Sequence, residues 1–294
     1  MPLTCIYFTA AIRAIEGRAL RLRPAPRLMA RAGIAAAKIA KGMLDERGSR
    51  ILVVAGPGNN GGDAFEAASH LRAWFFRVDV AFLGDAAKLS ADARLALDTW
   101  QSAGGRHLSV LPKAGSIARD YDLIIDGLFG IGLGRPLQGP YARAVETINL
   151  AGRPVLSLDV PTGIDSDTGR VMGCAVRATR TLSFIALKPG LVTLDGPDYC
   201  GDVQVDSLGL DAPAMHPVQG CLLDDTTIGK ALSRRPKNFH KGNAGDVAVL
   251  GGAPGMVGAA LLAGRSALLC GAGRVHVGLI DDSAPRVDMI RPEL

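Results

Sequence analysis

One stretch of the sequence decides the fold class: Ile51-Leu52-Val53-Val54-Ala55-Gly56-Pro57-Gly58-Asn59-Asn60-Gly61-Gly62-Asp63. The first five residues are apolar and mostly β-branched, which predicts a strand. Glycines follow at once, and a stretch with helical spacing continues from Asp63 to Phe75. A strand, a glycine-rich turn and a helix in this order are typical of a nucleotide-binding α/β unit.

The same alternation of strands and helices continues on both sides of this unit. Strands are predicted over 51–55, 78–83, 123–126, 155–159, 181–186 and 203–205, and helices over 26–44, 63–75, 91–102 and 141–150. Repeated βαβ units predict a mostly parallel sheet with helices on both faces. Ligands of such sheets bind beyond the carboxyl ends of the strands, so the loops after Ala55, Asp126 and Asp159 are the expected places for chemistry.

The first loop permits more than one interpretation. It satisfies the pattern G-x-G-x-x-G, and Asp85 at the end of the next strand stands where a ribose-binding acid is expected, which is typical of a nicotinamide-dependent oxidoreductase. A tight turn with Asp63 as helix cap is the structural alternative. The side chains of Asn59 and Asn60 favour a binding role, because their amides add specific donors and acceptors at the strand end.

The next two loops each begin with an acid that closes a strand. A buried carboxylate such as Asp126 needs a cation or several hydrogen-bond donors. Asp159 is suited to proton transfer if a partly dry cleft holds it, and Thr162 has oxygens for a hard cation. Caps and turns remain the alternative for each acid. Three such loops at one sheet edge predict a single shared pocket.

Two further features of these loops bear on ligand binding. Glycines at 130, 132 and 134 offer a backbone surface for phosphate, and Arg135 adds charge and bidentate hydrogen bonds. Lys188 follows another strand and is either a member of the same cleft or a solvated surface lysine.

The composition excludes several classes of protein. The 294 residues carry a net charge of +5 that is spread along the chain, which disfavours nucleic-acid binding. No apolar stretch reaches the length of a membrane span. Five widely spaced cysteines without C-x-x-C spacing argue against zinc or a disulfide framework and predict the reducing cytoplasm. The scattered arginines near the N-terminus do not make a convincing targeting peptide, because Glu16 lies among them.

The ordered motifs resemble the NAD(P)H-hydrate epimerase family over residues 7 to about 210. The matching segments are Gly56–Asp63, Asp126–Leu133 with Arg135, Asp159–Gly163, Lys188–Leu191 and Tyr199–Gly201. The resemblance implies a Rossmann-like three-layer αβα sandwich, usually a homodimer, that acts on the hydrated cofactors NADHX and NADPHX and uses one potassium ion.

The family's functional residues carry over to positions of this sequence. The resemblance implies substrate binding by Asn59, Asn60, Gly61, Gly62, Asp63, Gly130, Ile131, Gly132, Leu133, Gly134, Arg135, Pro136 and Asp159. It implies potassium binding by Asn60, Asp126 and Thr162, and we expect proton transfer by Asp159 with Lys188 at C6 of the reduced nicotinamide ring. Ala30 and Ala64 depart from the family pattern, which usually has a polar or acidic residue and a glycine at these positions. A non-catalytic nucleotide-binding or dimerisation module is the alternative.

A second unit is predicted after a linker near 210–220. We place the epimerase domain at 1–215, and the rest, 216–294, resembles the start of an ADP-dependent NAD(P)H-hydrate dehydratase with a ribokinase-like α/β fold. The resemblance rests on His240–Gly245 and Gly251–Ala260. The later nucleotide loop and catalytic aspartate of that family are absent from the sequence, so no dehydratase activity is expected. ADP or ATP is expected as cofactor only for a complete domain.

Overall fold

The chain folds as two units, Met1–Asp224 and Asp225–Leu294. The computed structural model describes residues 4–44, 50–108, 110–223, 225, 228–229 and 235–294. The described helices include none that is long and apolar enough to cross a membrane.

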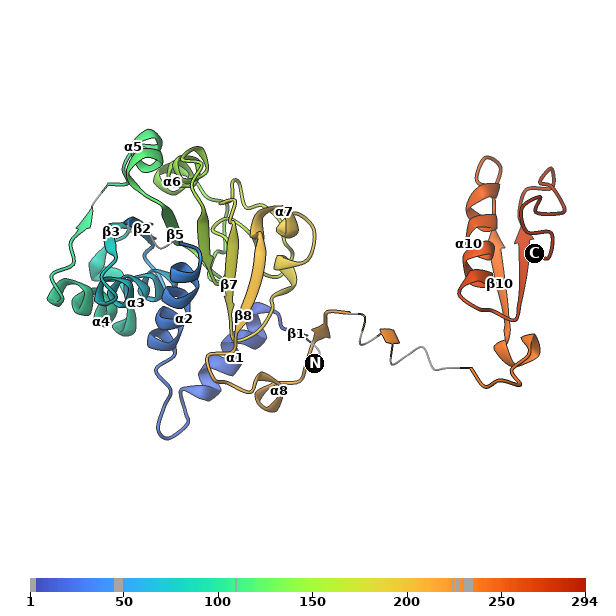
Figure 1. Cartoon of the computed structure of the whole chain (residues 1–294), viewed down its shortest axis with the longest axis horizontal. Helices are drawn as coiled ribbons and strands as arrows, with labels where there is room; N and C mark the ends of the chain where they lie inside the picture. Colours follow the sequence, from blue (N-terminus) through green and yellow to red (C-terminus); the bar gives the residue numbers. More distant parts are fainter. Residues whose placement is uncertain (1–3, 45–49, 109, 224, 226–227, 230–234) are drawn as a thin grey trace. The chain divides into compact units, whose positions relative to one another are not determined.

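Seven parallel strands form the central sheet of the first unit (Figure 1). They are β2 Arg50–Ala55, β3 Arg77–Phe82, β4 His107–Leu108, β5 Leu123–Gly127, β6 Val155–Leu158, β7 Arg180–Phe184 and β8 Asp202–Asp206. Their order is β4-β3-β2-β5-β6-β7-β8. The connections after β2 and β5 therefore lead to opposite sides, and this topological switch point is where ligands bind in such sheets. The predicted parallel sheet is confirmed.

Helices cover both faces of this sheet. Helices α1 Thr9–Ala19, α2 Leu28–Gly42, α3 Asn59–Ala73 and α4 Ala91–Ser102 lie on one face, and α5 Ala114–Asp120 and α6 Gly139–Leu150 on the other. The alternation of side chains along β2 divides the core: Ile51 and Val53 pack toward α3, whereas Leu52 and Val54 pack toward α6. The predicted three-layer αβα sandwich is confirmed.

Two helices differ from the sequence-based expectation. Helix α1 was not predicted, although it buries Ile12 and Ile15 completely or nearly so. Helix α3 begins at Asn59 rather than at Asp63, so Asp63 lies in its second turn and is not its cap.

The segment expected to be a linker belongs to the first unit. It forms helix α8 Ala212–Met215 and strand β9 Gly220–Cys221, and β9 pairs antiparallel with β1 Cys5–Ile6. This pairing moves the division of the chain from residue 215 to Asp224. Three short helices, η1 Ala86–Lys88, η2 Pro189–Leu191 and α7 Gly196–Cys200, complete the first unit's described elements.

The second unit contains one βαβ motif after the short helix η3 Lys241–Ala244. Strands β10 Asp246–Gly251 and β11 Arg274–Leu279 are parallel, and α10 Val257–Leu269 connects them. Ala260 and Val275 are the buried hydrophobic residues in its described part. Leu250 is 84% exposed, as expected for a piece of sheet that lacks covering layers.

Candidate active site

A cavity of about 1060 Å³ lies beyond the carboxyl ends of β2, β5 and β6. Helices α1, α2, α3 and α4 and the loops after these strands contribute to its walls. The wall includes these residues predicted from the sequence: Asn59, Asn60, Asp63, Gly130, Ile131, Gly132 and Asp159. The structure therefore brings the three strand-end loops to one pocket, as predicted.

A buried ion pair joins Asp159 and Lys188 at this cavity. The Nζ atom of Lys188 lies 2.5 Å from Oδ1 of Asp159, and it also donates to the Ser183 hydroxyl and the Phe184 carbonyl. The lysine is fully buried, whereas the Asp159 side chain is 12% exposed at the cavity. The main-chain N–H of Ile131 donates to the second oxygen of Asp159 over 3.0 Å. Lys188 is thus buried behind the cavity wall, where it pairs with Asp159, and is not a solvated surface residue.

The backbone around Asp159 is constrained to place its carboxylate. Asp159 has a φ of 66°, and Ile185 at the end of β7 has a φ of 70°, a conformation that non-glycine residues rarely adopt. Such strain persists at functional sites where the surrounding structure imposes it. Gly130 is required beside it, because a Cβ atom there would lie 2.6 Å from Oδ2 of Asp159.

A second buried acid, Asp126, lies at the end of β5. Its carboxylate accepts hydrogen bonds from the Ser157 hydroxyl and from both the N–H and the hydroxyl of Thr162, with a longer bond from Leu128 N–H. Burial raises the pKa of Asp126, and these hydrogen bonds oppose that rise. The side chain is fully buried and has no ion pair with a described residue.

Asn60 supplies an unsatisfied oxygen near the same strand end. Its side-chain Nδ2 donates to the Leu158 carbonyl, but its Oδ1 is buried and has no hydrogen-bond partner among the residues that the structure describes. Its main-chain oxygen packs against Gly127, the neighbour of Asp126. A buried acceptor without a donor is costly and calls for a ligand.

Carboxylates crowd the cavity wall near Asp159. The pKa of Asp63 is raised well above its ordinary value, first by burial and then by the negative charges of Asp159 and Glu16. Burial also raises the pKa of Glu16, again with a contribution from Asp159. These groups favour protons in the folded state.

This crowding predicts a pH-dependent stability. The folded protein holds the Asp63 proton more tightly than the unfolded chain, so the resulting stability is full below about pH 4 and is lost as pH rises through the raised pKa. We expect Asp63→Asn to be more stable than the wild type at pH 8 and the gain to vanish near pH 4 in urea unfolding. Asp98→Asn, on the exposed side of α4, is the control. A gain that is equal at both pH values would contradict this charge effect.

Several residues predicted to bind substrate do not line the cavity in this structure. Gly61 and Gly62 serve packing, since Cβ atoms there would lie 2.0 Å from the Gly56 oxygen and 2.6 Å from the Met29 side chain. The segment 133–136, which includes the exposed Arg135, lies outside the wall. The binding assignment of these residues stays a prediction.

The structure also weakens the oxidoreductase alternative. The Asp85 carboxylate caps helix η1 by accepting from the Ala87 N–H, and its Oδ2 atom lies 3.8 Å from Nζ of Lys88. It is not part of the cavity wall. The acid needed for the ribose of an ordinary dinucleotide is therefore engaged elsewhere.

Sequence reasoning missed the contribution of the helices to the cavity. Arg13 and Glu16 come from α1, Arg27 precedes α2, and Leu95 and Thr99 come from α4. The buried positions 11, 12, 15 and 19 have helical spacing, which was the available signal for α1.

The fold and the site together define a class: a Rossmann-like α/β domain with a ligand cavity and buried carboxylates at the switch point of its sheet. Comparison with known proteins gives the family. Residues 25–190 match the model described as YjeF-related protein N-terminus. The chain belongs to this family, the NAD(P)H-hydrate epimerases, which are isomerases.

Of two similar proteins, one is named as an epimerase alone and the other as a bifunctional repair enzyme. It is 47% identical over 185 residues to an NAD(P)H-hydrate epimerase of Achromobacter xylosoxidans, with 63% of this chain and 86% of that protein covered. It is 37% identical over 295 residues to a bifunctional NAD(P)H-hydrate repair enzyme of Coxiella burnetii, with 99% of this chain covered. The chain spans 60% of the length of that relative.

A solved structure supports the fold. The yeast protein YNL200c (ynu0) superposes with a TM-score of 0.57 at 22% identity, covering 68% of this chain and 86% of its own.

Proposed function

We propose that the first unit interconverts the R and S epimers of NADHX and NADPHX at C6 of the reduced nicotinamide ring. The observation that carries this proposal is the Asp159–Lys188 pair, which is buried on the lysine side and open to the cavity on the carboxylate side. Groups that transfer protons are most effective when a partly dry site holds them in position.

The chemistry requires the hydroxyl group at C6 to leave and water to return on the opposite face. In the proposed mechanism the C6–O bond breaks as the hydroxyl takes up a proton and leaves as water, while the ring nitrogen supplies the electron pair. Water then adds to the other face and gives its proton back to the protein. Lys188 and Asp159 exchange these protons through their 2.5 Å contact. The Ile131 N–H keeps the Asp159 carboxylate in place during both steps.

The residues at the end of β5 fit a potassium ion. Potassium is held by oxygen atoms, often neutral ones, that replace its hydration shell. Asn60 offers the unpartnered Oδ1, Thr162 a hydroxyl, and Asp126 a buried negative charge. When bound, the ion would neutralise Asp126 and order the loops that carry the substrate.

Removal of potassium is expected to lower both stability and activity. An ion present at about 100 times its Kd stabilises the folded state by about 2.7 kcal/mol, and replacement by choline removes that gain. In Asn60→Ala the melting temperature should no longer respond to potassium, whereas the control Asn238→Ala, at an exposed position, should respond fully. A wild-type protein whose melting temperature is the same in potassium and in choline would contradict this site.

A coupled assay tests the proposed function. The purified chain is mixed with both epimers of NADHX, potassium and an excess of a separate S-specific, ADP-dependent dehydratase. Consumption of the R epimer beyond its slow spontaneous rate establishes the epimerase. If a folded sample leaves the R epimer untouched, the domain is a non-catalytic binding module.

The identity of the second unit and the assembly of the first are proposed from similarity to relatives. We infer that residues 225–294 correspond to the beginning of the second part of the bifunctional relatives, because the match to the Coxiella protein covers 99% of this chain. Its one βαβ motif buries few apolar side chains, so we expect no dehydratase activity from it. A homodimer in the cytoplasm is the expectation for the first unit.

A further inference from the structure

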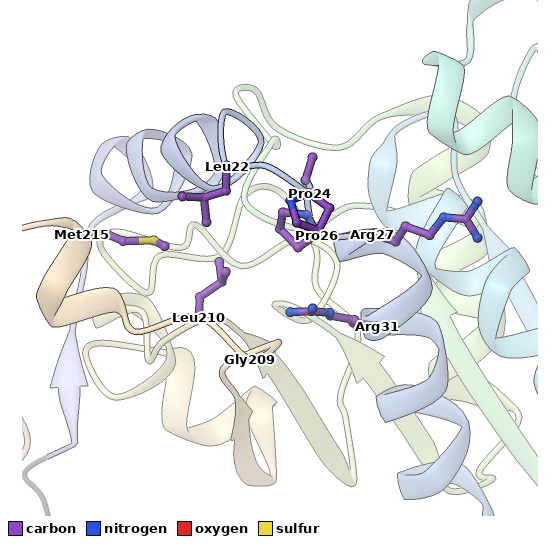
Figure 2. Close-up of a pocket in the computed structure, with 9 residues that line it drawn as sticks. Leu22, Pro24, Pro26, Arg27, Arg31, Gly209, Leu210 and Met215 are labelled. Carbon is purple, nitrogen blue, oxygen red and sulfur yellow. The ribbon is translucent and has the colours of Figure 1, made fainter.

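A smaller cavity of about 450 Å³ opens between the loop that joins α1 to α2 and the segment after β8 (Figure 2). Its walls are apolar: Leu22, Pro24 and Pro26 from the loop face Leu210 and Met215 from the segment after β8. The Arg31 guanidinium reaches into it next to Gly209, whereas Arg27 points away from it. We call this cavity the Arg31 pocket.

Arg31 is held in position without a negatively charged partner. Its Nη1 donates to the Leu208 carbonyl over 2.6 Å. Gly209 lies directly beside the guanidinium, since a Cβ at that position would lie 2.8 Å from Nη1. In the described part of the chain no carboxylate pairs with Arg31. The remaining N–H groups of the guanidinium are therefore available to an anion, with one part of the side chain already ordered.

The Arg31 pocket adjoins the active-site cavity. Both are lined by residues 25–27, and Leu208 lines the active-site cavity while its carbonyl accepts the Arg31 hydrogen bond. A long ligand seated at Asp159 can therefore extend past this shared wall into the Arg31 pocket.

The distribution of charge decides which end of a ligand belongs there. The active-site cavity is lined by the carboxylates Glu16, Asp63, Glu66, Asp92 and Asp159 and by two arginines, Arg13 and Arg27. A terminal phosphate with two negative charges is disfavoured among these acids. The Arg31 pocket has an arginine without an acid, and its proline, leucine and methionine side chains offer apolar surface to a flat base.

We propose that the Arg31 pocket binds the adenosine end of the hydrated cofactor and that Arg31 binds the 2′-phosphate that distinguishes NADPHX from NADHX. This inference rests on the proposed function, because it takes the dinucleotide substrate from it. Arg31 is then the residue that makes the enzyme prefer the phosphorylated cofactor.

Binding of NADP⁺ and NAD⁺ to the full chain, measured by calorimetry, tests the inference without relying on turnover. These two ligands differ only in the 2′-phosphate. Wild-type protein should bind NADP⁺ roughly 10- to 100-fold more tightly, the worth of charge-assisted hydrogen bonds to one phosphate. Arg31→Met should abolish this preference while leaving the Kd of NAD⁺ unchanged. Arg31→Lys should keep part of it, because an ammonium binds phosphate without the bidentate geometry of arginine. Lys38→Met, an exposed cation on the same helix, should keep all of it.

The pocket itself is probed with adenosine 2′,5′-bisphosphate against adenosine 5′-monophosphate, which should show the same preference and the same loss. Equal weakening of NADP⁺ and NAD⁺ in Arg31→Met would overturn the inference, as would a wild-type protein with no preference or a preference that the variant retains. A wild-type protein could prefer NADP⁺ through Arg31 and yet leave R-NADHX unchanged in the coupled assay. That result would refute the proposed epimerase activity but not the binding role of the Arg31 pocket.

Discussion

Asp159→Asn is expected to lower kcat for R-NADHX by about 10²- to 10⁴-fold, the usual contribution of a positioned acid–base group. Asparagine has nearly the shape of aspartate and retains an oxygen to accept the Ile131 N–H, so the cavity keeps its form. The asparagine amide, unlike the carboxylate, cannot accept a proton from Lys188. The Kd of NADP⁺ should change little, which separates loss of chemistry from loss of binding.

The coupled assay with excess dehydratase measures this effect. Asp98→Asn, an exposed aspartate on α4, is the matched control and should have wild-type activity. Near-normal turnover by folded Asp159→Asn would show that another group transfers the proton.

Lys188→Met is expected to lower both activity and stability. The lysine is fully buried and donates to three partners, and its removal leaves the Asp159 carboxylate without its cation in a largely dry site. Breaking a buried ion pair on one side costs about 3–5 kcal/mol of folding free energy. Because the Asp159 side chain is 12% exposed, the lower end of that range is expected. Urea unfolding measures the loss.

A double variant separates the structural effect from the catalytic one. Lys188→Met with Asp159→Leu removes both charges, and an apolar pair of similar volume should recover most of the lost stability. Activity should remain absent, because the two groups proposed to transfer the proton are both gone. Full stability in Lys188→Met alone would mean that the ion pair contributes nothing to folding, and recovery of activity in the double variant would rule out proton transfer by this pair.

Local patterns predicted the sheet and most of its helices. The runs at 51–55 and 123–126 are short, almost entirely apolar and each followed by a glycine, so a buried strand was the natural interpretation, and β2 and β5 confirm it. The interval between strands predicted covering helices on both faces. The N-terminal helix was not predicted, although its buried positions have helical spacing, and its first turn is held by a distant residue: the Thr9 N–H donates to the Asp167 carboxylate. A cap supplied by a residue 158 positions away leaves no local signal.

The start of α3 is a second place where local sequence did not predict the helix. Asn59, Asn60 and two glycines are poor helix formers, and the sequence therefore predicts a loop there. In the fold the helix nevertheless begins at Asn59, and Gly61 lies so close to the Gly56 oxygen that only glycine fits there.

The sequence by itself determined the class of fold, the parallel sheet and the strand-end segments that carry Asp126, Asp159 and Asn60, because these depend on residues close together in the chain. Only the tertiary structure decided which of these groups share a partner. It pairs Lys188 with Asp159, leaves Asn60 Oδ1 without a donor and sets Arg31 beside Leu208. The physical reason is that charge pairing and burial depend on distances across the sheet, and no spacing along the chain encodes those distances.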